Sequence, residues 1–441
     1  MIIDYLIPGS SKNAFWLSFI VCLSACCVIL FIVAPITGLS QNFGAGNDGY
    51  IQLARSIVAG DGYVFENGGP KVFNRPPMYP IFLVPVALFP ENLQRYVIIF
   101  PQSLLVGFIG MLIFKIAAKL FNLATAKISL LFFLLNPWVY WNAKNPMTAI
   151  LQTFLYLLFT YLVAKALFEK NNFKLILYSL SIGLSGGALV LSHAAMLPVA
   201  AFFIGIIFLV SLFKNKDRIV TAIISGLIVI CLVAPWTYRN WLAFGKFIPV
   251  SGGGGLAYFN GNVHWNFMEN QPQKKGETYI DASLRVLAID GNEATATHWK
   301  GFKDIADEEI ANAKMVEDIK NKPALFIKKT TSNAVEYYFP SLTYPFLAVK
   351  VKSVEQIPLT VFHLGLWICA AFGICYYRRS GLLLLAAIIF YAVWYFPFAT
   401  FIGHSLYTLG TIPFLCILSA AGIISTVAKI FNLQSSISNP S

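Results

Sequence analysis

Long uninterrupted apolar runs recur along the chain, and no other feature restricts its fold so strongly. A helix needs about 20 apolar residues to cross a bilayer. The chain of 441 residues is 57% hydrophobic and 12% charged, about half the charged fraction of soluble domains. We therefore predict an all-α polytopic membrane protein with about ten transmembrane helices. The predicted spans are 14–36, 94–114, 128–143, 148–168, 174–191, 194–213, 219–236, 357–377, 381–400 and 405–428. The third is short, so it can be tilted or re-entrant.

Basic residues in four short loops predict the orientation of the chain. Counting spans puts all four loops on the same side, which the positive-inside rule makes cytoplasmic. Both termini then face the cytoplasm, while the long segments 37–93 and 237–356 face outward. The net charge of +12 follows from this topology, so no nucleic-acid partner is predicted. The basic residues are Lys115, Lys119 and Lys127; Lys165, Lys170 and Lys174; Lys214, Lys216 and Arg218; and Arg378 and Arg379.

The spans and outer segments divide the chain into three regions. Residues 1–236 form an N-terminal transmembrane core that includes the first outer loop, 37–93. Residues 237–356 form an outer region that holds most of the acidic residues and predicted interfacial helices. Residues 357–441 carry the C-terminal transmembrane helices.

The first outer loop holds the clearest candidates for chemistry. Asp48 precedes a short amphipathic stripe, so it either caps that helix or acts as a general base. Arg75 lies in the motif Asn-Arg-Pro-Pro-Met-Tyr-Pro, where two prolines stiffen the turn. Its guanidinium either binds a phosphate or extends to lipid headgroups, with Tyr79 as an aromatic neighbour.

A partner loop begins at the end of the seventh predicted span. It carries Arg239, Asn240, a glycine run at 252–255 and Asn262. The glycines leave backbone N–H groups exposed, which can bind an anion or a sugar. A nucleotide-binding loop is excluded, because no helix with Lys-Ser or Lys-Thr follows.

Other candidates lie at the outer ends of spans. Lys144 is a candidate substrate-binding residue, while His193 and His404 are more typical of hydrogen-bonded packing residues. No His, Asp, Glu or Cys cluster has the spacing of metal ligands, so no metal and no other cofactor is predicted. The dependence of activity on a divalent metal stays open.

Four ordered motifs resemble the C-type glycosyltransferases. They are Asn-Asp-Gly-Tyr at 47–50 with the following helix, Arg-Pro-Pro-Met-Tyr-Pro at 75–80, the segment 234–250 continuing to 265, and 405–415. Within that superfamily the chain is similar to the protein O-mannosyltransferases and the aminoarabinose transferases.

The resemblance implies an integral-membrane enzyme in the bacterial inner or plasma membrane. Such an enzyme moves a hexose or pentose from a polyprenyl-phosphate donor to a lipid, protein or glycan acceptor, with its active site on the outer face. It further implies that Asp48 acts near the acceptor and that Arg75 and Arg239 bind the donor phosphate. The chain departs from the family where Leu406 replaces an Arg, where His193-Ala194 replaces Arg-Pro, and where Gly49 replaces an acid.

Other functions are compatible with parts of the pattern. A lipid-linked polysaccharide polymerase or ligase would also use a lipid-linked sugar at an outer loop. A secondary transporter predicts ionisable residues at the centres of spans, and these are essentially lacking. A non-catalytic membrane scaffold is the remaining alternative.

Overall fold

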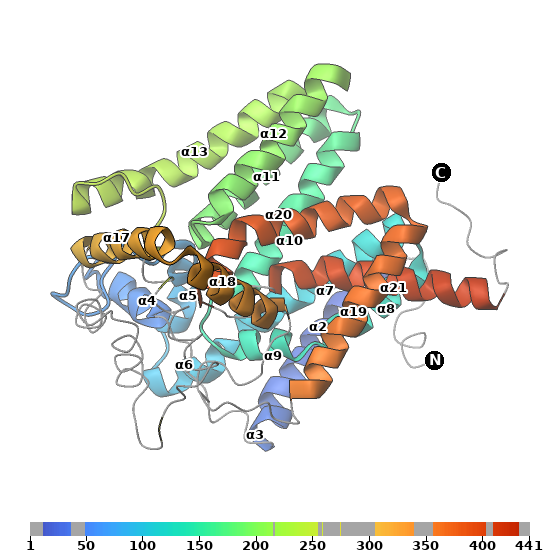
Figure 1. Cartoon of the computed structure of the whole chain (residues 1–441), viewed down its shortest axis with the longest axis horizontal. Helices are drawn as coiled ribbons and strands as arrows, with labels where there is room; N and C mark the ends of the chain where they lie inside the picture. Colours follow the sequence, from blue (N-terminus) through green and yellow to red (C-terminus); the bar gives the residue numbers. More distant parts are fainter. Residues whose placement is uncertain are drawn as a thin grey trace.

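The computed structural model describes residues 12–36, 49–214, 217–254, 258, 274, 305–338, 356–402 and 409–431. Within these ranges the regular elements are helical, and β-structure is limited to one bridge between Val64 and Lys71. The predicted all-α class is therefore confirmed for the described part of the chain (Figure 1).

The N-terminal half contains most of the helices. They are α2 (Lys12–Val28), the π-helix η1 (Ile29–Val33), α3 (Ala34–Ile36), α4 (Tyr50–Ala59), α5 (Met78–Ala87), α6 (Glu91–Val97), α7 (Ile99–Leu120), α8 (Leu123–Leu134), α9 (Pro137–Lys144), α10 (Ala149–Phe168), α11 (Asn172–Ser192), α12 (Met196–Lys214) and α13 (Asp217–Phe244). The later helices are α17 (Ile305–Asn321), α18 (Pro323–Tyr338), α19 (Gln356–Tyr376), α20 (Arg378–Ile402) and α21 (Ile412–Ile430).

Seven helical segments in the described residues are long and apolar enough to cross a membrane. They are Asn13–Ile36, Glu91–Leu120, Ala149–Phe168, Asn172–Ser192, Met196–Phe213, Arg218–Phe244 and Leu409–Ile430. The chain is thus a multi-pass membrane protein. The predicted eighth and ninth spans coincide with α19 and α20, whose described apolar stretches are shorter. The predicted number of ten spans stays a prediction.

The third predicted span is a bent pair of helices. The axes of α8 and α9 differ in direction by 55°, and together they pass the same test of length and composition. Asn136 follows the end of α8 and caps α9, because its Oδ1 accepts the N–H of Trp138 at 3.0 Å. Pro137, which has no N–H, then begins α9. The short apolar run at 128–143 therefore corresponds to two helices with a break between them.

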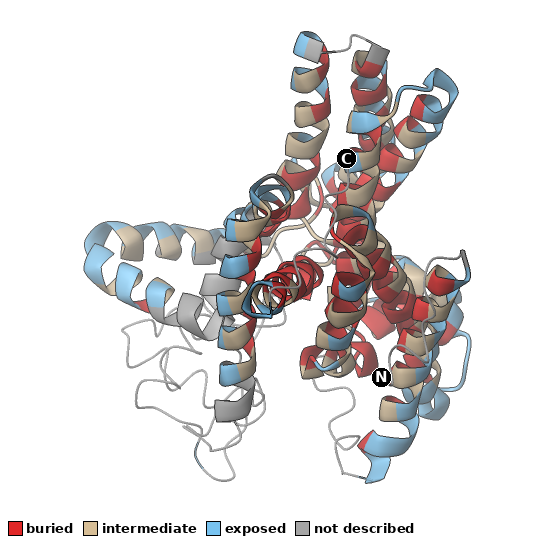
Figure 2. Cartoon of the chain, turned by 90° about the vertical axis from the view of Figure 1, so that its right-hand side faces the viewer, coloured by how far each residue is buried: buried red, intermediate tan, exposed pale blue. Residues whose placement is uncertain are grey.

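The C-terminal helix α21 lies in the interior and is buried along most of its length (Figure 2). It packs against α8, α19 and α20. Its approach to α19 is closest at two glycines. A Cβ on Gly422 would lie 1.9 Å from the carbonyl oxygen of Cys369, and one on Gly373 would lie 2.2 Å from that of Leu418. Only glycine allows the two backbones to pack this closely.

The four basic loops lie together at one end of the helical bundle. Phe121, just after α7, contacts Tyr377 before α20, with ring centroids 4.8 Å apart. Lys119 is close enough to Lys165, near the end of α10, for their charges to repel each other. The Nη2 of Arg218 donates to the carbonyl oxygen of Glu169 at 2.9 Å. The grouping predicted from the positions of the spans is therefore present, whereas its assignment to the cytoplasm stays a prediction.

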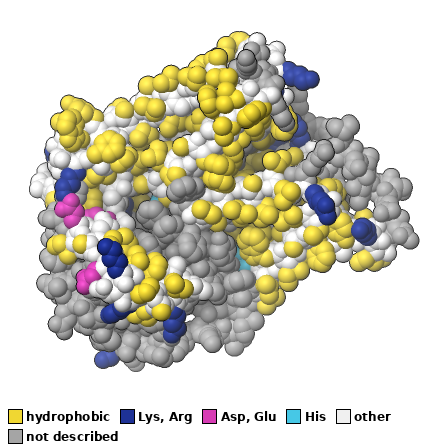
Figure 3. Space-filling view, turned by 45° about the horizontal axis from the view of Figure 1, so that its top comes forward, with side chains coloured by type: hydrophobic (Ala, Val, Ile, Leu, Met, Phe, Trp, Pro, Cys, Tyr) yellow, Lys and Arg dark blue, Asp and Glu magenta, His cyan; other side chains and the backbone are white. Residues whose placement is uncertain are grey.

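The helices of the outer segments lie at the opposite end. In Figure 1, α4, α5, α6 and α17 lie together at the left, away from the basic loops. The described surface seen in Figure 3 is largely apolar, and the acidic side chains visible there lie at the left-hand edge. The helices α4, α5, α6 and α17 are therefore well separated from the four basic loops (Figure 1).

Candidate functional site

The predicted amphipathic stripe after Asp48 forms α4, which buries Tyr50, Leu53 and Ala54. Asp48 itself lies outside the described residues. Gly49, at the start of the helix, has φ = +82°, which disfavours any side chain there. An added Cβ would also lie 2.2 Å from the Phe65 ring. The backbone conformation thus explains why glycine stands at this position.

The turn that carries Arg75 is held by the hydroxyl of Tyr63. This hydroxyl is positioned to donate to the carbonyl oxygens of Arg75 at 3.0 Å and Pro76 at 2.9 Å. Burial, reinforced by Tyr50, raises the pKa of Tyr63 well above its usual value, so the hydroxyl keeps its proton. The guanidinium of Arg75 donates to the carbonyl oxygen of Asn74 at 3.1 Å and lies 5.7 Å from the ring of Tyr50. Arg75 is half-buried on a fixed backbone.

Tyr79 is fully buried between α4 and α5. Its ring meets that of Tyr50 edge-on at 5.2 Å and stacks on Phe82 at 5.8 Å. Its hydroxyl has no hydrogen-bond partner among the described residues, and burial raises its pKa. The structure therefore places Tyr79 in the core beneath the Arg75 turn, and its predicted contact with substrate stays a prediction.

Arg239 joins the end of α13 to the first outer loop. Its Nη1 donates to the carbonyl oxygen of Val72 at 2.8 Å, and its Nη2 lies 3.4 Å from that of Tyr63. The guanidinium lies 4.9 Å from the ring of Trp236, 5.3 Å from that of Tyr63 and 5.4 Å from that of Phe244. Backbone carbonyls and three rings thus hold this cation in place.

Asn240 fixes the turn that follows α13. Its fully buried side chain donates from Nδ2 to the carbonyl oxygens of Ile248 at 3.0 Å and Val250 at 3.1 Å. The indole N–H of Trp236 donates to Val250 as well, at 2.7 Å. These contacts direct the chain back toward the first outer loop, where the N–H of Gly252 meets the carbonyl oxygen of Phe73 at 3.1 Å.

The glycine run binds an anion that belongs to the chain itself. The N–H of Gly253 donates to Oε1 of Glu308 on α17 at 3.0 Å. Asn312, one turn further along α17, donates to the same oxygen at 3.2 Å. Lys246 and Glu309 form an ion pair beside this contact. The glycine N–H groups were predicted to bind an anion or a sugar, and in the structure one of them binds the carboxylate of Glu308 from the same chain. Asn262 lies outside the described residues.

His193 lies close enough to Arg75 to feel its positive charge, a proximity that sequence reasoning missed. It ends α11, which contacts α5, and its Nδ1 accepts the N–H of Ala195 at 3.2 Å. Burial, together with the positive charge of Arg75, lowers the pKa of His193 to about 3. The imidazole is therefore neutral with its proton on Nε2. One hint of this special environment was present in the sequence, because His193-Ala194 stands where the resembling family has Arg-Pro.

Lys144 ends α9 and is 5% exposed. Its ammonium lies 4.2 Å from the centre of the Trp141 ring. The neighbouring carbonyl oxygen of Asn145 accepts the side-chain N–H of Gln102 on α7 at 2.6 Å. Lys144 thus belongs to a buried polar layer at the bent span, and its role toward substrate stays a prediction. His404 and Leu406 lie outside the described residues.

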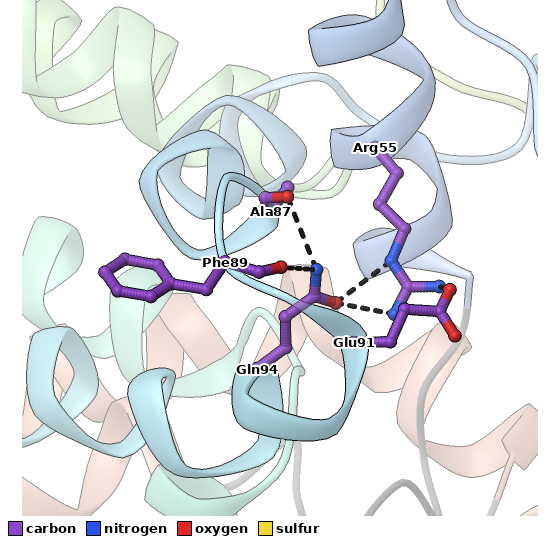
Figure 4. Close-up of polar contacts among 5 residues, drawn as sticks. All are labelled: Arg55, Ala87, Phe89, Glu91 and Gln94. Atoms are coloured by element: carbon purple, nitrogen blue, oxygen red, sulfur yellow. Dashed lines mark hydrogen bonds and ion pairs between the residues drawn. The ribbon is translucent and has the colours of Figure 1, made fainter.

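A second residue set that sequence reasoning missed fixes α4 on α6 (Figure 4). Arg55 of α4 donates to Oε1 of the buried Gln94 at 2.9 Å and 2.5 Å, and it pairs with Glu91. Gln94 in turn donates to the carbonyl oxygens of Phe89 at 2.7 Å and Ala87 at 3.3 Å. We call Arg55, Glu91 and Gln94 the α4 clamp.

Metal ligands do not cluster in the described residues, where no group of three or more His, Cys, Asp and Glu side chains is found. The expectation that the enzyme needs no resident metal is untested, because Asp48 and other outer-loop acids fall outside those residues.

Residues 74–238 match the family described as dolichyl-phosphate-mannose-protein mannosyltransferase. The matched segment contains Arg75, Tyr79, Lys144 and His193. Comparison with curated proteins found no match to this sequence.

Solved structures with a similar fold include two of the oligosaccharyltransferase from Archaeoglobus fulgidus. One holds AglB in complex with an inhibitory peptide and a dolichol-phosphate (13% identity, TM-score 0.53), and the other is the apo form (14% identity, TM-score 0.54). They match 98% and 97% of this chain, which covers 53% and 52% of theirs, so it spans about half their length. ArnT from Cupriavidus metallidurans bound to undecaprenyl phosphate is a weaker match (13% identity, TM-score 0.43, covering 97% of this chain and 82% of its own). Over residues 74–238, the family match agrees with the resemblance to the protein O-mannosyltransferases that the motifs indicated.

Proposed function

We propose, from this resemblance to C-type glycosyltransferases, that the chain is an integral-membrane glycosyltransferase that takes its sugar from a polyprenyl-phosphate donor. The acceptor is a lipid, a protein or a glycan. The match of residues 74–238 to the mannosyltransferase family carries the proposal. It includes the Arg75 turn, to which the end of α13 is tied by Arg239.

Arg75 is the proposed contact for the donor phosphate. A sugar phosphate reacts when negative charge develops on its leaving group, and a fixed cation stabilises that charge. Tyr63 fixes the backbone of Arg75, and His193, which is neutral, adds no second positive charge near its guanidinium. The predicted contributions of Lys144, Asn240, Tyr79 and Asn262 belong to the same proposal.

Asp48 is the proposed general base. It immediately precedes Gly49 in the sequence, at the start of α4. It would take the proton from the acceptor hydroxyl or amine as that oxygen or nitrogen attacks the anomeric carbon. Attack opposite the phosphate would invert that carbon.

The outer face is the proposed location of this reaction. The four basic loops gather at the end of the bundle opposite to α4, α5 and α17. Since basic loops are retained in the cytoplasm, the opposite end faces outward.

Comparison of cells with and without the protein tests this function. Mass spectrometry of envelope lipids and glycoconjugates is expected to show the loss of one hexose or pentose unit without it. Complementation with Asp48→Asn is expected not to restore that unit, whereas the matched control Asp61→Asn, at an exposed loop position, is expected to restore it. Full restoration by Asp48→Asn would refute the base assignment. An unchanged envelope would refute the glycosyltransferase.

A lipid-linked polysaccharide polymerase or ligase is the alternative. The observation that favours this alternative is the similarity in fold to an oligosaccharyltransferase. The same mass spectra separate the two, because a polymerase or ligase changes a whole repeat or chain rather than one sugar.

A further inference from the structure

Three lysines converge at the basic end of the bundle. Lys115 and Lys119 lie in the last turns of α7, and Lys165 lies in the last turn of α10. Lys119 and Lys115 are both close enough to Lys165 to repel its ammonium group. The ammonium groups of Lys115 and Lys165 lie 5.3 Å and 5.8 Å from the centre of the Tyr161 ring. We call Lys115, Lys119 and Lys165 the lysine triad.

The triad lacks a matching set of carboxylates in the part of the chain that the structure describes. Glu169 is the acid that acts on Lys165. Its Oε1 already accepts the N–H groups of Lys170 at 3.0 Å and Asn171 at 3.1 Å. The single carboxylate of Glu169, which already binds two backbone N–H groups, cannot neutralise the three ammonium groups of the triad. Like charges this close repel one another unless an anion lies between them.

The surroundings of the triad suit the phosphate of a lipid. Lys115 and Lys165 are half-buried between two spans and Lys119 is exposed, so the charges face a site that is open on one side. The spans end within a few residues, at Leu120 and Phe168, which is the depth of phospholipid headgroups. The adjoining α2 contacts Lys115 through Phe15 at 5.9 Å and exposes Trp16 and Ile20, which offer apolar surface to acyl chains.

We propose that the lysine triad and Tyr161 form a binding site for a phosphate anion, and that its occupant is the headgroup of an anionic phospholipid. Basic sites between transmembrane helices recognise such headgroups by charge and shape. The site lies at the opposite end of the bundle from the Arg75 turn, and it does not depend on the proposed enzymatic activity.

Native mass spectrometry of the purified protein in detergent tests the site with phosphatidylglycerol and phosphatidylcholine as probes. The wild type is expected to retain phosphatidylglycerol at least about 10-fold more strongly than phosphatidylcholine. Lys119→Gln with Lys165→Gln is expected to remove most of this preference. The control, Lys170→Gln with Lys174→Gln, removes the same charge from exposed positions in the adjoining loop and is expected to keep it.

The melting temperature with and without lipid is a second measurement, and it distinguishes a loss of lipid binding from a folding defect. Without lipid, the Lys119→Gln, Lys165→Gln variant is expected to be at least as stable as the wild type, because it loses a repulsion. With phosphatidylglycerol, only the wild type and the control gain stability. Equal retention of both lipids by the wild type, or equal losses in the variant and the control, would overturn the site. Saturation by inorganic phosphate alone, with no added effect of phosphatidylglycerol, would overturn the lipid as occupant.

Discussion

At the scale of single residues, Arg239 holds the end of α13 on the first outer loop through backbone carbonyl oxygens and aromatic rings. Its replacement by Met is expected to cost about 2–4 kcal/mol, since hydrogen bonds to a charged group and contacts with three rings are lost together. Arg239→Lys keeps the charge but not the planar fork, so an intermediate loss is expected. Thermal unfolding in detergent measures both. Arg95→Met, at an exposed position, is the control, and an equal effect of Arg95→Met and Arg239→Met would contradict the assignment.

His193 makes stability depend on pH in a defined direction. Its pKa is lowered in the folded protein, so between pH 6.5 and about 3 the unfolded chain binds a proton that the folded chain does not. Stability is therefore fully present above pH 6.5 and falls as the pH decreases through this window. At pH 5 the loss is expected to be about 1–2 kcal/mol relative to His193→Asn. Melting temperatures of both proteins at pH 7.5 and pH 5 give this difference. Identical pH dependence in the two would mean that His193 is not held neutral.

At the scale of elements, the α4 clamp sets how the helix after Asp48 is oriented. Replacing Arg55 by Met leaves the amide oxygen of the buried Gln94 without its charged donor, at an expected cost of about 1–2 kcal/mol. The effect should be local, because the clamp ties α4 to α6 while most of the core lies elsewhere. Limited proteolysis in the segment 60–69 is expected to become several-fold faster. Proteolysis at the wild-type rate would show that α4 is held by its apolar face alone.

Elements with a strong local signal were predictable from the sequence. The stripe Tyr50, Leu53, Ala54 predicted α4, and the short apolar run at 128–143 predicted an irregular span. What the sequence did not reveal are contacts between distant positions. Arg239 with Val72, His193 with Arg75 and Gly253 with Glu308 are brought together only by tertiary packing. Local periodicity carries no information about such pairs, and Asp48 and Asn262 remain untested predictions.

At the scale of the whole molecule, the orientation of the bundle has a direct test. A single cysteine replacing Asp61 is expected to react with a membrane-impermeant maleimide in intact cells if the first outer loop faces outward as proposed. One replacing Lys170, at the basic end, is expected to react only after the membrane is permeabilised. Both positions are exposed, so burial does not bias the comparison. The native cysteines are removed or shown to be unreactive beforehand. The reverse labelling pattern would invert the topology.

The contact of Glu308 with Gly253 constrains how this chain can be recombined with others. One carboxylate on α17, one glycine N–H and one guanidinium at the end of α13 link three segments that lie far apart in sequence. A chimera that exchanges only α17 removes the carboxylate that binds Gly253, and one that exchanges only the first outer loop changes the backbone that Arg239 binds. Segments 63–75, 236–253 and 305–312 therefore form one transferable unit, and they should be exchanged together when substrate preference is re-engineered.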